Sequence, residues 1–273
     1  QTGFDKLDQE IIKKGLCCVC GACAGVCPSQ GIRMSYGTAP LYQAEIEPIL
    51  SGKCREGCQV CYQVCPGRDI PLPAMDEMVF GRRRDPETEP LGIYQECLGG
   101  YARNDTIRRE GANGGAGTAI LTYALQEGII DGVIAAGYDP VAPWRGQPRI
   151  VTTEEELLET GGRIWELVPQ LSLLWEAVHN KGLKKIALTC SPCHAHAIRK
   201  MQLLNLPETR KIMDSISFTL GVFCSIRFFF QATKHALFEL CGVERLEDVA
   251  RLKYRAGKTP KHFTVELTNV KKA

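Results

Sequence analysis

The chain has 273 residues, 44% of them hydrophobic, and a formal net charge of +2. A chain of this length can bury a full core and still hold a second, smaller module. The near balance of charge excludes a nucleic-acid binder held by bulk electrostatics. No apolar run reaches the roughly eighteen residues of a membrane span, and the charged start, residues 1–15, does not resemble a signal peptide. We therefore expect a cytoplasmic protein, free or peripheral to a membrane complex.

The first part of the chain, residues 1–80, is dominated by cysteine. It holds nine of the fourteen cysteines, with many turns and little sustained periodicity. Such composition is typical of a small module stabilised by metal rather than by a hydrophobic core. Disulfide scaffolds belong to short secreted chains, so metal or cluster ligation is the better interpretation.

Residues 81–100 are predicted to be a linker. They carry Gly81, three consecutive arginines (Arg82–Arg84) and two prolines, Pro86 and Pro90. We interpret the arginine run as a solvated linker, with a docking patch for an acidic partner as the alternative.

Residues 101–273 are predicted to form a second domain of α/β type. Periodicity and capping signals predict helices over 116–127, 194–204 and 228–241, and a helical stretch from 153 towards 180 with a break at 161–162. Short apolar runs predict strands over 131–136, 184–189, 215–223 and 262–268. Because strands and helices alternate, a layered α/β architecture is expected.

Two cysteine sets have the spacing of bacterial two-cluster ferredoxins. The first, Cys17, Cys20, Cys23 and Cys27, reads C-x2-C-x2-C-x3-C-P. The second, Cys54, Cys58, Cys61 and Cys65, has one extra residue between its first two members. We predict two 4Fe-4S clusters.

In such motifs the fourth cysteine ligates the other cluster. Crossed ligation assigns Cys17, Cys20, Cys23 and Cys65 to one cluster and Cys54, Cys58, Cys61 and Cys27 to the other. Zinc sites and disulfides are the alternatives, but zinc motifs rarely carry the third C-x2-C step and the terminal Cys-Pro. Cys18 is interpreted as a packed thiol.

Two features of the second domain suggest a ligand. The loop Gly111–Thr118 is rich in glycine and opens a predicted helix, an arrangement suited to phosphate binding, although a tight turn without a ligand would look the same. Cys190-Ser191-Pro192-Cys193 lies between a strand and a helix and suggests a redox dithiol or, with Cys224, a further cluster or a substrate-facing thiol.

Buried, inert thiols are the simplest expectation for Cys224 and Cys241. His194 and His196 face different sides of a helix and are poor joint metal ligands.

These motifs together resemble a known family. The two cysteine sets, the glycine loop with its helix (Thr118–Val133), D-P-x-x-P-W (Asp139–Trp144), T-C-S-P-C (Thr189–Cys193) and G-V-F-C (Gly221–Cys224) are similar to the beta subunit of coenzyme F420-reducing hydrogenase and its relatives. The resemblance implies an N-terminal two-cluster bacterial ferredoxin-like module fused to a mixed α/β FAD-binding domain. It also implies partner subunits in a redox complex of the hydrogenase, formate dehydrogenase or membrane dehydrogenase type.

The resemblance further implies which residues hold FAD. At the positions that match the family's motifs, FAD would be held by the glycine loop, by residue 163 and by the turn at 191–193. These residues are Asn113, Gly114, Gly115, Ala116, Gly117, Thr118, Arg163, Ser191, Pro192 and Cys193. Relatives tend to have a Gly-Ser-Lys-Tyr-like turn where this chain has Thr160–Arg163, so Arg163 replaces lysine and Ile164 the aromatic residue. The chain also ends soon after Thr268, earlier than the resemblance leads us to expect, so either this member is short or a C-terminal part is missing.

Three functions follow as hypotheses. The first is an F420-dependent oxidoreductase in which FAD converts between hydride and single-electron transfer. The second is a reductase of the same fold in which FAD reduces an organic substrate with electrons from ferredoxin. Arg163 and Ile164 motivate this hypothesis. The third is an electron-wiring subunit without flavin.

Overall fold

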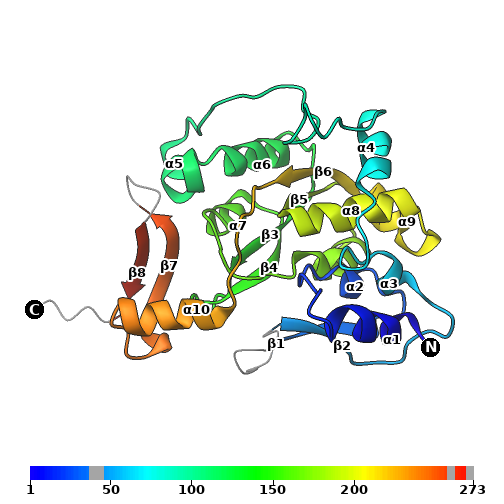
Figure 1. The fold of residues 1–273 in the computed structure, drawn as a ribbon. Helices are drawn as coiled ribbons and strands as arrows, with labels where there is room; N and C mark the ends of the chain where they lie inside the picture. Colours follow the sequence, from blue (N-terminus) through cyan, green and yellow to red (C-terminus); the bar gives the residue numbers. More distant parts are fainter. Residues whose placement is uncertain (37–45, 257–261, 269–273) are drawn as a thin grey trace, which may run out of the picture.

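The structure is a computed structural model that describes residues 1–36, 46–256 and 262–268. Its N-terminal part contains short helices beside a two-stranded antiparallel sheet in which Ile32 pairs with Leu50 (Figure 1). The elements are α1 (Gly3–Leu7), the π-helical turn η1 (Asp8–Ile12), α2 (Ala22–Gly25), β1 (Ile32–Tyr36), β2 (Ile46–Leu50), α3 (Val60–Gln63) and α4 (Leu72–Phe80).

The segment between α4 and α5 (Asp105–Glu110), which includes the predicted linker, contains neither helix nor strand. Its arginines are nevertheless paired. Arg82 binds Glu89, Arg83 binds Glu77, and Arg84 binds the buried Asp76 through Nε and Nη2 at 2.6 and 2.7 Å. The pairs of Arg83 and Arg84 hold the start of this segment against α4, and the pair of Arg82 joins two points within the segment.

The second part is built on a four-stranded sheet of order β4-β3-β5-β6. Strands β3 (Gly132–Tyr138), β5 (Ile186–Cys190) and β6 (Ile216–Gly221) are parallel, whereas β4 (Gly146–Val151) runs antiparallel to β3 at the edge. The three parallel strands fall within a residue or two of their predicted ranges. Strand β4 lies where the sequence predicts no strand.

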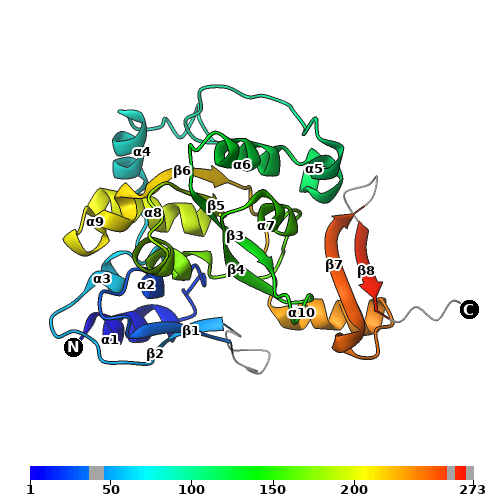
Figure 2. The same cartoon turned by 180° about the vertical axis from the view of Figure 1, so that it is seen from behind.

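Helices cover both faces of this sheet (Figures 1 and 2). On one face Val133, Ala135 and Ala187 pack with residues of α6 (Ala116–Gln126) and α7 (Glu154–Glu159). On the opposite face lie η3 (Gln170–Leu173), the π-helical turn η4 (Glu176–Asn180), α8 (Pro192–Leu204) and α9 (Pro207–Asp214). Side chains alternate between the two faces along each strand, which is how a sheet buried on both sides is packed.

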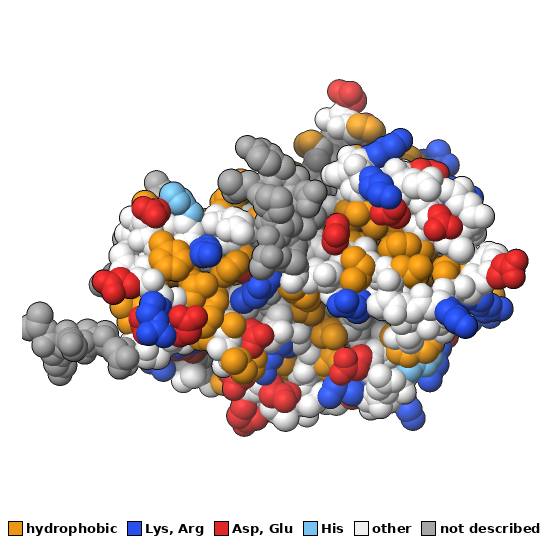
Figure 3. Space-filling model, turned by 90° about the horizontal axis from the view of Figure 1, so that it is seen from below, with side chains coloured by type: hydrophobic (Ala, Val, Ile, Leu, Met, Phe, Trp, Pro, Cys, Tyr) orange, Lys and Arg blue, Asp and Glu red, His pale blue; other side chains and the backbone are white. Residues whose placement is uncertain are grey.

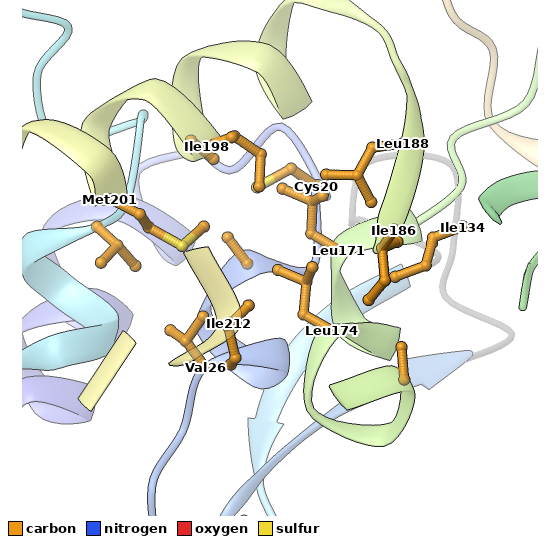
Figure 4. Close-up of a cluster of buried hydrophobic side chains, with 14 of the residues drawn as sticks. Cys20, Val26, Ile134, Leu171, Leu174, Ile186, Leu188, Ile198, Met201 and Ile212 are labelled. Carbon is orange, nitrogen blue, oxygen red and sulfur yellow. The ribbon is translucent and has the colours of Figure 1, made fainter. Parts of the chain in front are cut away.

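The N-terminal part shares a core with the sheet. Cys20 and Val26 lie in one cluster with Ile134 of β3 and Leu188 of β5 (Figure 4). The backbones of α2 and η3 also approach each other closely, because a Cβ added to Gly25 would lie 1.8 Å from the Leu171 carbonyl oxygen. The mixed α/β fold expected from sequence is observed. The division of the chain at residues 80 and 100 into separate domains stays a prediction.

A C-terminal unit completes the fold. Helix α10 (Phe230–His235) continues into the π-helical turn η5 (Ala236–Leu240), and the short η6 (Leu246–Asp248) precedes the antiparallel strands β7 (Val249–Ala256) and β8 (His262–Leu267). Leu237, Leu252 and Tyr254 form its core with partly buried Trp144 and Trp165. The predicted helix 228–241 and strand 262–268 are both present.

The surface carries charge of both signs. On the face shown in Figure 3, acidic and basic side chains are interspersed, and hydrophobic side chains gather over the N-terminal part and over the C-terminal unit. Within the described residues, no helix combines the length and the apolar character that crossing a bilayer requires.

Candidate functional site: a cavity at the sheet edge beside the cysteine sets

A cavity of about 860 Å³ lies at the carboxyl ends of the parallel strands. Ala136 of β3, Thr189 of β5 and Leu220 and Gly221 of β6 line it. Open α/β sheets bind ligands at this edge, and the volume suits an organic cofactor.

The glycine loop forms one wall of the cavity. Asn113, Gly114 and Gly115 have φ values of 52°, 87° and 72°, so three consecutive residues adopt the left-handed conformation. A Cβ on Gly115 would lie 2.5 Å from the Ile107 carbonyl oxygen, and glycine is therefore required there. Helix α6 begins at the next residue, and its free amide groups and positive dipole end favour an anion such as phosphate.

Seven of the ten residues expected to hold FAD line this cavity: Asn113, Gly115, Gly117, Thr118, Arg163, Ser191 and Pro192. Gly114, Ala116 and Cys193 do not belong to its lining. The loop, the turn after α7 and the turn before α8 are thus brought together from positions far apart in the chain.

The turn between β5 and α8 is held by a buried histidine. His194 is 4% exposed, and burial lowers its pKa to about 4, so the ring is neutral at physiological pH. Its Nε2 donates to the Val168 carbonyl oxygen at 3.2 Å, which leaves Nδ1 to accept from the Ser191 hydroxyl at 2.9 Å. The histidine is a core residue, and it orients Ser191 at the cavity wall.

A second part of the wall is formed by residues 222–227, of which sequence reasoning had suggested only Cys224 as a substrate-facing thiol. Arg163 Nη2 donates to the Phe223 carbonyl oxygen at 2.9 Å, and Arg227 Nη1 donates to the Ile164 and Glu166 carbonyl oxygens. Phe223 is 90% exposed at the cavity. The G-V-F-C motif marked the start of this segment, but no sequence signal indicated that Ile226 and Arg227 border the cavity.

Members of the two cysteine sets lie beside one another. Cys61 has Cys27, Cys54 and Cys58 as neighbours, and burial followed by the charges of these thiols raises its pKa to about 12. Burial likewise raises the pKa of Cys23, whose neighbours are Cys17, Cys65 and Cys61. Each neighbourhood contains the fourth cysteine of the opposite set.

Among the described residues, no three His, Cys, Asp or Glu side chains converge closely enough to hold a single metal ion. A cubane binds its thiolates at separate corners, so its ligands stand further apart than those of one ion. Cys61 and Cys23 each have three further thiols nearby, which is the number of additional thiolates that a cubane takes, and the eight ligands stay a prediction.

The turn before α8 also reaches the first cysteine set. The Cys193 thiol lies in contact with Cys18, which in turn contacts Cys20. The Leu171 N–H donates to the Cys20 carbonyl oxygen at 3.1 Å. Ser191 and Pro192 therefore face the cavity while Cys193, in the same turn, faces the cysteine sets.

The expectation that Cys224 and Cys241 are buried is wrong. Cys224 is partly exposed and lines the cavity, and Cys241 is exposed. Cys241 follows η5, whose outward side chains include Leu240 at 78% exposure. Helical spacing alone did not indicate which side of this element faces solvent.

Two family profiles match the chain, and both describe the beta subunit of coenzyme F420 hydrogenase/dehydrogenase. The profile of its N-terminal part matches residues 97–175, and the profile of its C terminus matches residues 183–273. The cavity lies within these ranges. The predicted cluster ligands precede them.

Individual relatives agree with the profiles. Coenzyme F420 hydrogenase subunit beta of Methanosarcina barkeri is 35% identical over 162 residues, covering 58% of this chain and 55% of the relative. Coenzyme F420-dependent sulfite reductase of Methanocaldococcus jannaschii is 28% identical over 260 residues, covering 91% of this chain and 36% of the relative.

A solved structure of the F420-reducing [NiFe] hydrogenase complex from Methanosarcina barkeri contains a similar chain. The TM-score is 0.52 at 30% identity, and the similarity covers 62% of this chain and 55% of that one. The matched regions span 55% to 59% of the length of the hydrogenase beta subunits from three methanogens. The chain belongs to the coenzyme F420 hydrogenase/dehydrogenase beta subunit family.

Proposed function

We propose that the chain is an iron–sulfur flavoprotein subunit that exchanges a hydride between coenzyme F420 and FAD and passes electrons through two 4Fe-4S clusters. Bound flavin would supply the conversion between electron pairs and single electrons. The chain's residues would hold the flavin, exclude water from it and keep it beside the clusters.

The β5–α8 turn is the observation that carries this proposal. Ser191 and Pro192 line the cavity, and Cys193 contacts Cys18 beside the predicted ligand Cys20. A ligand in the cavity would therefore be separated from the first cysteine set by a single turn. Electron transfer between the cavity and the first cysteine set requires such proximity. If the two sites had unrelated roles, they would not need to lie close together.

The cavity has the polarity expected for an anionic cofactor. Residues at the amino-terminal ends of α6 and α8 line it, as do Arg163 and Arg227. Both features favour diphosphate and a negatively charged ring system. The partners proposed are the other subunits of a redox complex of the hydrogenase, formate dehydrogenase or membrane dehydrogenase type. Relatives are named as subunits of coenzyme F420 hydrogenase, F420-dependent formate dehydrogenase and F420H2 dehydrogenase.

The test is anaerobic purification or reconstitution of the whole chain, followed by identification of released flavin and analysis of iron and sulfide. About eight of each per chain are expected from two cubanes. Reduced coenzyme F420 should then bleach the flavin absorption. Zinc in place of iron, or a chain that binds no flavin, would reject the proposal.

A ferredoxin-fed reductase of an organic substrate is the second candidate. The observation that favours it is the apolar rim of the cavity, where Val222, Phe223 and Ile226 are 43%, 90% and 56% exposed. Such a rim suits an uncharged substrate. Turnover with reduced coenzyme F420, compared with turnover with reduced ferredoxin or viologen, separates the two functions.

A further inference from the structure

Helix α8 connects the cavity with the predicted cluster that Cys65 would ligate. Its first residue, Pro192, lines the cavity, and Lys200 lies two turns further along. At about 1.5 Å per residue the two positions are about 12 Å apart along the helix. The same rigid element therefore contacts both proposed redox sites.

Lys200 is buried against the N-terminal part of the chain. Its side chain is 3% exposed. The ammonium donates to the Cys65 carbonyl oxygen at 2.8 Å and to the Asp69 carbonyl oxygen at 3.1 Å, and it forms an ion pair with the Asp69 carboxylate. Each of its three donors thus has an acceptor, as a buried ammonium requires.

The two charges of this ion pair are not equally screened. The Asp69 side chain is 53% exposed, whereas Lys200 is almost inaccessible to water. Solvent weakens the field of the carboxylate more than that of the ammonium. The residual field at Cys65 is therefore positive.

We infer, on the basis of the proposed function, that Lys200 is a positioning residue that raises the reduction potential of the cluster ligated by Cys17, Cys20, Cys23 and Cys65. Reduction adds one electron and one negative charge to a cluster, and a fixed positive charge stabilises that product. The same contacts hold the 65–69 segment so that the Cys65 thiolate keeps its direction. This cluster is the one beside Cys18 and Cys193, so Lys200 adjusts the electron acceptor or donor nearest the cavity.

The test compares variants of the whole, cluster-loaded chain. Lys200→Met removes the charge and keeps the length of the side chain, Lys200→Arg keeps the charge, and Asp69→Asn removes the opposing charge. Lys185→Met is the control, since Lys185 donates to the Gly128 carbonyl oxygen at the other end of the sheet. Potentials are measured by dithionite titration monitored by electron paramagnetic resonance, with iron and sulfide determined for each sample.

Lys200→Met should shift the equilibrium of one cluster towards the oxidised form by at least tenfold, which is about 59 mV for a one-electron couple. Asp69→Asn should shift it in the opposite direction by less, while Lys200→Arg and Lys185→Met leave it near the parent value. The opposite signs distinguish charge from loosened packing.

Unchanged potentials, or shifts of the same sign in Lys200→Met and Asp69→Asn, would overturn the inference while leaving the proposed function intact. If Lys200→Met does not fold, the Asp69→Asn variant tests the inference by itself. A shift of its cluster equilibrium towards the oxidised form, or no shift, would contradict the inference. Parent protein that holds no cluster would overturn the proposed function and this inference together.

Discussion

Arg163 Nη2 donates a hydrogen bond to the Phe223 carbonyl oxygen, so the turn after α7 and the loop after β6 are joined at the cavity. The sequence marked Arg163 as a departure from the pattern of its relatives. The structure shows that the side chain both contributes positive charge to the cavity and holds the opposite wall.

Arg163→Met should weaken flavin binding about tenfold, because a hydrogen bond to a charged group contributes roughly 1.5–3 kcal/mol and part of this is lost to solvent screening. A fluorescence titration of flavin-free protein measures the dissociation constant. Arg245→Met is the matched control, since Arg245 is 69% exposed and pairs with Glu247 away from the cavity. Equal affinities of the two variants would contradict a role for Arg163 in the site.

Gly115→Ala should destabilise the fold by about 2–4 kcal/mol, because φ is 72° and the new methyl group would lie 2.5 Å from the Ile107 carbonyl oxygen. Gly128→Ala is the matched control: its φ is 63°, but no atom lies within 4 Å of the added methyl group. That variant should lose only about 1 kcal/mol. Chemical denaturation compares them, and a Gly115 variant as stable as the Gly128 variant would refute the close approach.

Arg84→Met should cost about 2–4 kcal/mol of stability, because it leaves the Asp76 carboxylate, 3% exposed, without its partner. Arg83→Met should cost at most about 0.5 kcal/mol, since Arg83 and Glu77 are both mostly exposed. Denaturation midpoints at neutral pH measure both. If the two variants lose the same stability, the arginine run is a uniformly solvated linker after all.

Acidification should destabilise the protein through His194. Burial lowers its folded pKa to about 4, below the unfolded value of about 6.5, so the unfolded chain binds the proton more readily. Stability should therefore fall by up to about 1.4 kcal/mol for each pH unit between about 6.5 and the folded pKa of about 4. His194→Gln should be less stable at pH 7.5 but should show a flatter decline. Denaturation curves at several pH values between neutrality and pH 5 check this, and parallel declines in the two proteins would exclude His194 as the cause.

Crossed ligation predicts how alanine variants combine. Cys27→Ala and Cys54→Ala should remove the same cluster, so the double variant should lose no more iron than either single variant, about four atoms per chain. Cys27→Ala combined with Cys65→Ala should lose both clusters. Cys97→Ala, at an exposed cysteine outside both sets, is the control. Additive iron loss for Cys27 and Cys54 would contradict the assignment.

The cysteine spacing, the parallel strands and most helices could be read from the sequence, because these depend on local periodicity and on short motifs. Edge strand β4 escaped prediction since Pro148 within it argues against a central strand and its alternation is weak. Pairing with β3 makes it a strand, and Pro148 is tolerated because β4 lies at the edge.

Which side of each motif faces the cavity depends on the folded arrangement. The sequence grouped Ser191, Pro192 and Cys193 as one wall, yet packing turns Cys193 towards Cys18 and leaves the other two at the cavity. Folding also buries Lys200 against Cys65, although the two residues are separated by 135 positions. Such contacts depend on how a helix docks against a distant segment, and docking is set by the sum of many side-chain contacts rather than by any local pattern.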